Sequence, residues 1–195
     1  YKEIDYNKGI RRSYNSIGNV YKNQGNFNLA IEYYKKSLKG RDEIQDKIGI
    51  SIVLGNLGLL YKIQGNYEKA LKFLKKSLSI AEEFGRKESI YISCVHLGRL
   101  YSEIGNQHLA LKFSKKAFLV SKEMGNIHSI KYTSELLSEV YKKLGKYKQA
   151  LEMHELFMET KDSIAKMDAE EELYKFEVDK EYQLKKQADS ILHAD

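Results

Sequence analysis

The sequence has no proline, no tryptophan and a single cysteine, Cys94, among its 195 residues. Without proline to break helices, a chain rich in Lys, Glu, Leu and Ile is expected to be helical. One cysteine excludes a disulfide within the chain, and at an apolar helix position we expect it to be a small buried side chain. No apolar run approaches the roughly 18 residues that a membrane-spanning helix needs.

Motifs of catalysis and metal binding are also missing. The chain contains no Walker-type phosphate loop, no GxSxG, no HExxH and no paired CxxC. No two of its five histidines stand three or four residues apart, so a shared helical metal site is not expected. We therefore predict no catalytic residue, no cofactor and no metal in this segment, and we do not expect the segment itself to be an enzyme; turnover by the isolated segment is the alternative.

What the chain does contain is typical of a globular protein: 42% of its residues are hydrophobic and 31% are charged. The net charge of +6 is unevenly placed. Residues 1–165 carry 28 basic and 18 acidic residues, a net +10, whereas residues 166–195 carry 5 and 9, a net −4. This change in charge predicts a boundary near residue 166.

The most informative feature is a repeat with a period of 40 residues. Eleven of the 13 glycines have a partner 40 positions away, so these glycines mark a structural unit. Tyrosine, alanine and isoleucine follow the same spacing. The two glycine series are Gly25, Gly65, Gly105 and Gly145, and Gly18, Gly58 and Gly98 with Ser138 in the fourth place. The other series are Tyr21, Tyr61, Tyr101 and Tyr141; Ala30, Ala70, Ala110 and Ala150; and Ile10, Ile50, Ile90 and Ile130. A period between 20 and 50 residues indicates a solenoid.

Each unit is expected to hold two helices. In the second unit, apolar residues at helical spacing run from Ile50 to Tyr61, and a second stripe runs from Tyr67 to Leu78. Gly65-Asn66 separates them, because glycine readily adopts the left-handed conformation that ends a helix. One such pair cannot bury its apolar stripe alone, so neighbouring pairs must stack. Alanines are predicted where helices approach closely, and Gly18 and its equivalents where a side chain packs on the backbone.

These residues resemble the tetratricopeptide repeat (TPR), whose pattern is Leu-Gly-x-x-Tyr followed by Gly and Ala. "LGLLY" (residues 57–61), Gly65 and Ala70 fit this pattern, as do "IGNVY", "LGRLY" and "LLSEVY" with their partners. Two features depart from it: the period is 40 rather than 34, and the usual proline is absent. Six extra residues would lengthen the helices by about 9 Å per repeat. The resemblance implies an all-α fold, a right-handed α-α superhelix with a long C-terminal helix.

The repeat register divides the chain. We expect residues 1–8 to be the tail of a truncated upstream repeat, because they align with residues 41–48, and the array to have been cut from a longer chain. The predicted units are residues 1–8; repeats 9–46, 47–86, 87–126 and 127–166; and a C-terminal capping or linker helix, residues 167–195.

No glycine or proline interrupts the C-terminal segment, so a long helix from about Asp168 to Leu192 is expected. Part of it is predicted to cover the open apolar end of the last repeat through Leu173, Tyr174, Phe176 and Val178. Leu184, Ala188 and Ile191 keep a 4-then-3 spacing that would suit a short coiled coil, and hence self-association, although the seam is polar.

A repeated pair of lysines also marks the second helix of three units: Lys35-Lys36, Lys75-Lys76 and Lys115-Lys116. Acidic residues interleave with them, and aromatic stacking partners on that outer face are not evident. We favour a solvated face; anionic lipid or nucleic acid are the alternatives, and we expect no nucleic-acid partner.

The resemblance implies that a protein or peptide binds the concave face lined by the first helices. Transferring its groove slots gives thirteen candidates: Arg12, Asn15, Ser16, Asn19, Ile52, Asn56, Leu59, Ile92, His96, Arg99, Tyr132, Glu135 and Glu139. The asparagine amides are suited to a peptide backbone because they both donate and accept hydrogen bonds. Simple solvent exposure is the alternative for each candidate.

The C-terminal segment carries a second resemblance. "KYKQALEMHELFMETKDSI" followed by a long charged helix looks like TPR modules of Bacteroidetes-type signalling proteins, which precede a histidine kinase or an adenylate/guanylate cyclase. This implies a sensory or scaffolding region of a larger protein, with membrane contact only through that parent. The alternative is a free-standing cytoplasmic adaptor. The sequence does not distinguish a cytoplasmic from a periplasmic location.

Overall fold

A computed structural model describes the backbone of residues 2–192 and the side chains of residues 13–186. Within these residues the chain forms eight α-helices and no strand. Their bounds are α1 Lys2–Asn23, α2 Phe27–Asp42, α3 Lys47–Ile63, α4 Tyr67–Glu83, α5 Lys87–Glu103, α6 Gln107–Met124, α7 Ile127–Lys143 and α8 Tyr147–Leu192.

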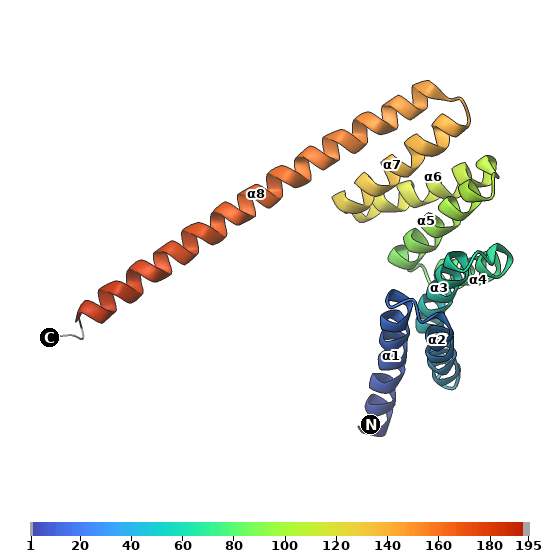
Figure 1. Ribbon diagram of the computed structural model, residues 1–195, viewed down its shortest axis with the longest axis horizontal. Coiled ribbons are helices and arrows are strands. Elements are labelled where there is room, and N and C mark those ends of the chain that lie inside the picture. The colour runs from blue at the N-terminus through green and yellow to red at the C-terminus, as the bar shows by residue number, and fades with distance from the viewer. Residues whose placement is uncertain (1, 193–195) are drawn as a thin grey trace.

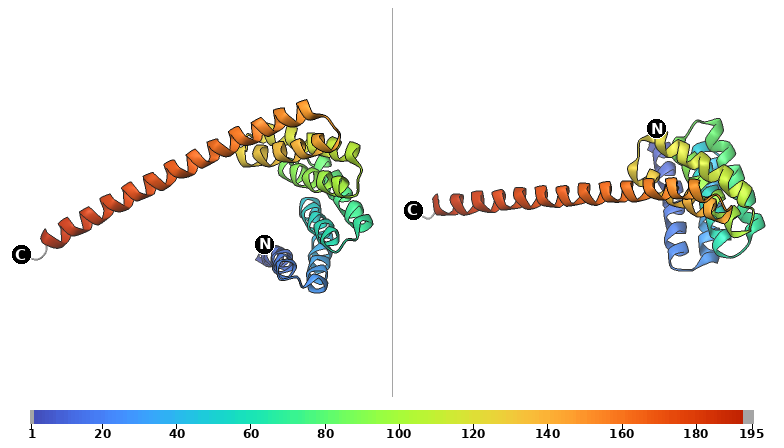
Figure 2. Two further views of the ribbon diagram at one scale, coloured as in Figure 1. Left: turned by 45° about the horizontal axis from the view of Figure 1, so that its top comes forward. Right: turned by 90° about the horizontal axis from the view of Figure 1, so that it is seen from above.

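The helices form a curved stack of antiparallel pairs, from which the far part of α8 projects (Figures 1 and 2). Each helix packs on the next one along the chain. The first helices α1, α3, α5 and α7 also contact their nearest equivalents, whereas the described second helices do not contact one another. The first helices therefore line the inner side of the curve. The predicted all-α, right-handed superhelix is confirmed.

The turns between paired helices are built by the glycines that the period singled out. Gly25, Gly65, Gly105 and Gly145 all have φ between 69° and 83°, a region that side chains with a Cβ rarely adopt. In the second and third repeats the asparagine that follows caps the next helix: the Oδ1 atoms of Asn66 and Asn106 accept hydrogen bonds from the Lys69 and Leu109 amides, each at 3.1 Å. Two residues thus end one helix and start its partner.

The periodic small residues lie where the helices approach most closely. Ala30, Ala70, Ala110 and Ala150 are essentially inaccessible to solvent. Gly58 packs directly beneath Leu74, because a Cβ on Gly58 would lie 2.6 Å from the Leu74 Cγ. In the fourth repeat Ser138 replaces this glycine and donates a hydrogen bond to the Ala150 carbonyl at 2.9 Å.

The periodic tyrosines stack on aromatic rings of the paired helix. Tyr61 lies on Phe73 with centroids 5.4 Å apart, and Tyr101 lies on Phe113 at 5.5 Å, both pairs nearly parallel. Such stacking adds about 0.5–1.5 kcal/mol to the burial of the rings. The tyrosines therefore join the two helices of one repeat.

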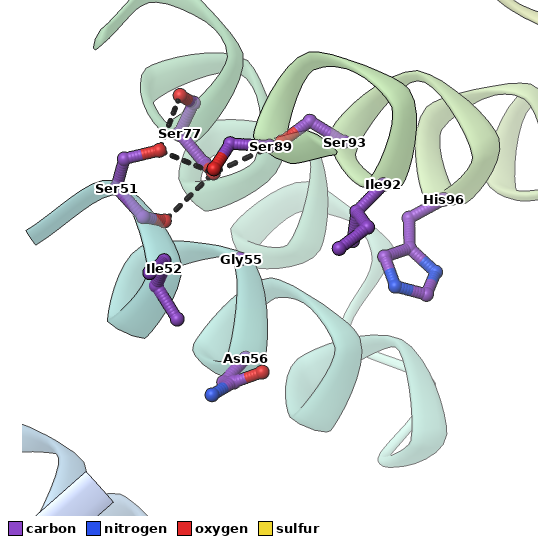
Figure 3. Close-up of a pocket in the computed structure, with 9 residues that line it drawn as sticks. All are labelled: Ser51, Ile52, Gly55, Asn56, Ser77, Ser89, Ile92, Ser93 and His96. Carbon is purple, nitrogen blue, oxygen red and sulfur yellow. Dashed lines mark hydrogen bonds between the residues drawn. The ribbon is translucent and has the colours of Figure 1, made fainter. Parts of the chain in front are cut away.

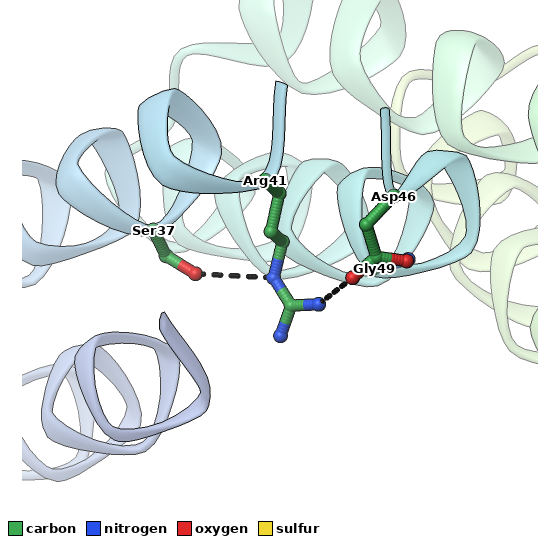
Figure 4. Close-up of polar contacts among 4 residues, drawn as sticks. All are labelled: Ser37, Arg41, Asp46 and Gly49. Atoms are coloured by element: carbon green, nitrogen blue, oxygen red, sulfur yellow. Dashed lines mark hydrogen bonds and ion pairs between the residues drawn. The ribbon is translucent and has the colours of Figure 1, made fainter. Parts of the chain in front are cut away.

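A buried arginine fastens the junction between α2 and α3 (Figure 4). The Arg41 Nε donates to Ser37 Oγ at 3.3 Å, and its Nη1 pairs with Asp46 Oδ2. The other Asp46 oxygen accepts from the Gly49 amide at 2.8 Å and so caps α3. A Cβ on Gly49 would collide with the Arg41 guanidinium, so glycine is required where arginine fills this junction.

The first helix differs from the sequence expectation. Residues 1–8 were expected to end a separate upstream helix, but α1 runs unbroken from Lys2 through Gly9 to Asn23. The equivalent positions 85 and 125 hold turn glycines with φ of 60° and 64°, whereas position 5 is Asp5. Glycine is not essential at this slot, since Gln45 adopts the turn there with φ of 54°. The side chains of residues 1–12 lie outside the described residues.

The last helix differs in the same way. Residues 168–192 do not form a separate helix but continue the second helix of the fourth repeat, because Ala165, a strong helix former, occupies the slot of Gly85 and Gly125. The expected capping contact is wrong. Leu173, Tyr174, Phe176 and Val178 are 45–67% exposed, since the straight helix carries them away from the last repeat. Ala188 and Ile191 lie outside the residues whose side chains are described.

The lysine pairs lie on the second helices, and some of these lysines contact other residues of the array. Lys75 lies over the Tyr101 ring and Lys115 over the Tyr141 ring, each 5.8 Å from the centroid, and so they contact the following repeat. Lys36 pairs with Glu32 at 2.6 Å. Lys36, Lys75 and Lys115 therefore have partners within the protein and need no ligand to explain their position.

No helix within the described residues is both long and apolar enough to cross a membrane.

Candidate binding site in the inner groove

The inner groove is the surface presented by α1, α3, α5 and α7. Twelve of the thirteen candidate residues have described side chains and lie on these four helices, because the 40-residue period repeats the same helix face. The thirteenth, Arg12, is on α1, but its side chain lies outside the described residues. The twelve do not form one continuous set; the structure divides them into three clusters with different surroundings.

A hollow of about 70 Å³ lies between α3 and α5 (Figure 3). Its rim is formed by Ile52 and Asn56 of α3 and by Ile92 and His96 of α5. Ile52 and Ile92 are 46% and 48% exposed, although isoleucine is usually buried. Two exposed aliphatic side chains beside an amide and an imidazole form a surface that can hold a ligand by both burial and hydrogen bonding.

Serines form the floor of this hollow. Ser51 Oγ donates to the Ser77 carbonyl at 3.0 Å, and Ser77 Oγ donates to the Ser51 carbonyl at 2.8 Å. Because the Ser77 proton is used in this way, Ser93 Oγ is the donor in the 3.0 Å contact with Ser77 Oγ. The small, mutually bonded serines keep the floor close-packed while leaving space above it.

His96 is held neutral in this environment. Burial lowers its pKa to about 4, and the nearby cations Lys62, Arg99 and Lys22 lower it further in the same direction. At neutral pH the imidazole is therefore uncharged and offers one donor and one acceptor. The positive charge on this part of the groove comes instead from the lysines and the arginine.

The asparagines of the first two repeats are largely engaged within the protein. Asn56 Nδ2 donates to Asn15 Oδ1 at 3.0 Å, which joins α3 to α1. Tyr34 donates to Asn19 Oδ1 at 2.7 Å, which joins α1 to α2. Ser16 remains exposed beside Val20 in a shallow depression of α1. Leu59 is half-buried on α3.

The last candidates form a mixed-charge cluster at the far end of the groove. The Arg99 guanidinium lies 4.7 Å from the centroid of the Tyr132 ring, a cation–π contact. Burial raises the pKa of Tyr132, whereas Arg99 lowers it. Glu135 and Glu139 are exposed on α7. The groove therefore carries Lys22 on α1 and Arg99 on α5, an ion pair between Lys62 of α3 and Glu103 of α5 at 2.6 Å, and acidic residues on α7.

Sequence reasoning missed several groove residues. The serine floor (Ser51, Ser77, Ser89 and Ser93) was not predicted, nor were the exposed Val20 of α1 and the lysines near His96, Lys22 and Lys62. A signal was available for the floor, since Ser37 and Ser77 are 40 residues apart at a slot that small residues fill. The lysines come from positions just after the transferred slots, and only the geometry brings them toward His96. Among the described residues, no three His, Cys, Asp or Glu side chains gather as metal ligands.

Two models described as tetratricopeptide repeat match the chain, over residues 9–83 and 91–123. Their 75 and 33 residues together cover 108 of the 195, more than half. The chain belongs to the tetratricopeptide-repeat family. TPR arrays are non-catalytic and serve protein–protein interaction or scaffolding, so this TPR array is a protein- or peptide-binding module. No curated protein matches the sequence.

Solved structures share this TPR fold at low sequence identity. BtubC (BKLC) from P. vanneervenii matches 80% of this chain and 64% of its own, with 17% identity and a TM-score of 0.73. Aspartyl phosphate phosphatase F from Bacillus subtilis matches 80% and 41%, with 17% identity and a TM-score of 0.75. A signal transduction ATPase with a tetratricopeptide repeat sensor from Pyrococcus horikoshii matches 82% and 25%, with 22% identity and a TM-score of 0.68. This chain therefore spans less than two thirds of each of these proteins.

Proposed function

We propose that this TPR array is the partner-binding region of a larger signal-transduction protein, in which the inner groove holds a protein segment and α8 transmits the bound state. The observation that carries the proposal is the hollow between α3 and α5. It combines exposed Ile52 and Ile92, a neutral His96 and a bonded serine floor on the concave face. About 70 Å³ is room for one short side chain, because a water molecule takes about 30 Å³.

The transmitting part of the proposal rests on α8. Beyond Ile164 the helix leaves the repeats and projects as one straight rod. The neighbour from Pyrococcus horikoshii, described as having a tetratricopeptide repeat sensor, joins such an array to an ATPase. We propose a comparable arrangement here, with a cyclase or histidine kinase as the output domain and with self-association through α8.

Capture of partner proteins by the immobilised chain tests the groove. We expect Ile52→Asp/Ile92→Asp to lower recovery of groove-bound partners by at least about tenfold, because two charges would replace the apolar rim. Leu119→Asp is the matched control: Leu119 is 60% exposed on α6, a second helix away from the groove. Equal losses in both variants, or in neither, would contradict groove binding.

The transmitting role is tested in the parent protein by measuring its output with and without residues 167–192. We expect the response to a bound partner to disappear while partner binding by the repeats remains. An unchanged response after this deletion would refute the role of α8.

A further inference from the structure

The part of α8 beyond the last repeat, residues 167–186, is here termed the arm. Every described residue of the arm is exposed, and α8 contacts no described helix other than α7. Large apolar side chains nevertheless lie along it, each 45–67% exposed: Met167, Leu173, Tyr174, Phe176, Val178, Tyr182 and Leu184. Exposed apolar residues at this density mark an interaction surface, and a bare helix in water is marginally stable.

The apolar residues lie on more than one side of the arm. At 100° per residue, Leu173 and Tyr174 are 100° apart, and Phe176 and Val178 are about 200° apart. A second α8 paired as a two-stranded coiled coil would cover only one narrow seam. The occupant must therefore contact the arm on several sides, as a groove does.

A coiled coil formed by two arms would also be destabilised by the charged residues along its seam. Phe157, Thr160 and Ile164 face α7 with alternating spacings of three and four residues. Continued along the arm, this series is Met167, Glu171, Tyr174, Val178, Glu181 and Lys185. Half of that seam would be charged, and in a parallel pair each glutamate would face its own equivalent, which destabilises the contact.

The inner groove has the complementary properties. Val20, Ile52 and Ile92 expose apolar surface along α1, α3 and α5. Lys22 and Arg99 bring positive charge to α1 and α5 near His96, whereas Lys62 of α3 is paired with Glu103 of α5 at 2.6 Å. A concave surface with exposed apolar and cationic side chains is suited to an acidic helix that carries exposed apolar residues.

The order of charges along the two surfaces also matches. The arm begins with acidic residues, from Asp168 to Glu172, and ends with Lys185 and Lys186. The groove runs from the cationic α1–α5 side to Glu135 and Glu139 on α7. Residues 170–186 span about 24 Å as a helix, and four adjacent helices at 8–10 Å spacing span about 24–30 Å. An arm running from α1 toward α7 would therefore oppose unlike charges at both ends.

The arm cannot reach the groove of its own chain, since α8 is one unbroken helix from Tyr147 to Leu192 that leads away from the array. We propose that the arm of one chain docks in the inner groove of a second copy. This rests on the proposed function of the groove and names its partner class, an acidic helix that exposes apolar side chains on several sides. An arm in the groove would compete with any other partner there.

Charge reversal separates this arrangement from pairing of two arms. The groove variant is Lys22→Glu/Arg99→Glu, and the arm variant is Asp168→Lys/Asp179→Lys, whose residues share one face and lie about 16 Å apart, close to the spacing of α1 and α5. At physiological salt, sedimentation equilibrium is expected to show each variant self-associating at least about tenfold more weakly than the wild type. A chain carrying all four reversals is expected to regain association to within about threefold of the wild type, because the unlike charges are restored.

The matched control reverses two lysines of the outer face, Lys35→Glu/Lys76→Glu, and is expected to self-associate like the wild type. Circular dichroism of each variant checks that the fold is intact. A wild-type chain that stays monomeric at its highest soluble concentration would overturn the proposal. So would a groove variant that associates normally while the arm variant does not, since the arms would then pair with each other.

The two proposals fail differently. If the chain does not self-associate but Ile52→Asp/Ile92→Asp still abolishes capture of other partners, the arm proposal is refuted and the groove function stands. If a labelled peptide of residues 165–192 binds the wild-type chain and the Ile52→Asp/Ile92→Asp variant equally, the peptide does not use the groove, and the arm proposal is refuted. Failure of the groove function itself is decided by the capture experiment with its Leu119→Asp control.

Discussion

Gly58→Ala should destabilise the array by about 2 kcal/mol, although alanine is the better helix former. A Cβ at position 58 would lie 2.6 Å from Leu74 Cγ and 3.2 Å from the Leu74 backbone nitrogen. Leu74 is completely buried, so neither α3 nor α4 can yield without disturbing the core. Overpacking of this kind costs up to about 3 kcal/mol, and the gain in helix propensity returns about 1 kcal/mol.

Gly55→Ala provides the matched control in the same helix. Its nearest neighbour would be the Ser77 Oγ at 3.3 Å, a contact that a small shift relieves. We expect its free energy of unfolding to stay within about 0.5 kcal/mol of the wild type, because the propensity gain offsets the tighter packing. Urea unfolding followed by far-UV circular dichroism measures both variants. Equal stability of the two would refute the claim that Gly58 is required for close approach of Leu74.

A double-mutant cycle locates the cause. Leu74→Ala alone should cost about 3 kcal/mol, because it empties a fully buried site. On that background Gly58→Ala should lose most of its penalty, which gives a coupling energy of about 2 kcal/mol. Additive costs would mean that the glycine acts through the helix backbone and not through this contact.

Four further outcomes follow from the structure. Gln45→Gly should stabilise the chain by about 0.5–1 kcal/mol in urea unfolding, because Gln45 has φ of 54° at the slot where Gly85 stands; a loss of stability would contradict this. Cys94, whose pKa burial raises to about 12, should react with a thiol reagent only as fast as the chain unfolds; rapid labelling of the native chain would show that it is accessible. The pKa of His96 falls from its ordinary 6.5 to about 4 on folding, so only the unfolded state gains this proton between those pH values; acidification through that window should lower stability, and His96→Gln should reduce the slope. Truncation after Lys166 should change the unfolding free energy by less than about 0.5 kcal/mol, since residues 167–186 are all exposed; a larger loss would reveal a contact of the arm within its own chain.

The sequence was informative wherever one residue type has a single structural use. Gly65 and its equivalents predicted the turns because few other residues accept a positive φ. Gly58 predicted a close helix contact because glycine is unfavourable inside a helix unless its lack of a side chain is needed, and Ala70 did so because a small residue recurs at its slot in every repeat. These signals recur every 40 residues, so chance occurrence was excluded before any contact was known.

The two ends could not be predicted by the same reasoning. Position 5 holds Asp5 and position 165 holds Ala165, so the register that predicts a turn elsewhere meets residues that do not form one. Both helices continue through these positions, and at Ala165 the strong helix propensity of alanine favours this. The sequence identified Leu173 and Phe176 as apolar. Whether they pack on the last repeat depends on the direction of α8, which is set by tertiary structure, and in the structure they are exposed.

The asparagines show a similar limit at the candidate site. Residue type and slot predicted that Asn15, Asn19 and Asn56 face the groove, and they were assigned to a ligand. In the structure Asn56 bonds to Asn15, and Asn19 accepts from Tyr34. Asn15 and Asn56 are 41 residues apart, which places them side by side on adjacent first helices once the stacking is known. The repeat period predicts which face of a helix a residue occupies, but not which neighbouring group forms a hydrogen bond with its side chain.

The missing turn at Ala165 has a mechanical consequence for the proposed transmission. The helix that packs on α7 is the same rigid rod that leaves the array, so a change in the angle of the last repeat moves the whole of residues 165–192. This segment is about 42 Å long, and a rotation of about 10° would displace its end by about 7 Å. Repeat arrays deform by such small rotations between neighbouring units. With a glycine turn at position 165, the same rotation would stay within the repeat, so the unbroken helix is what turns a change of curvature into a displacement.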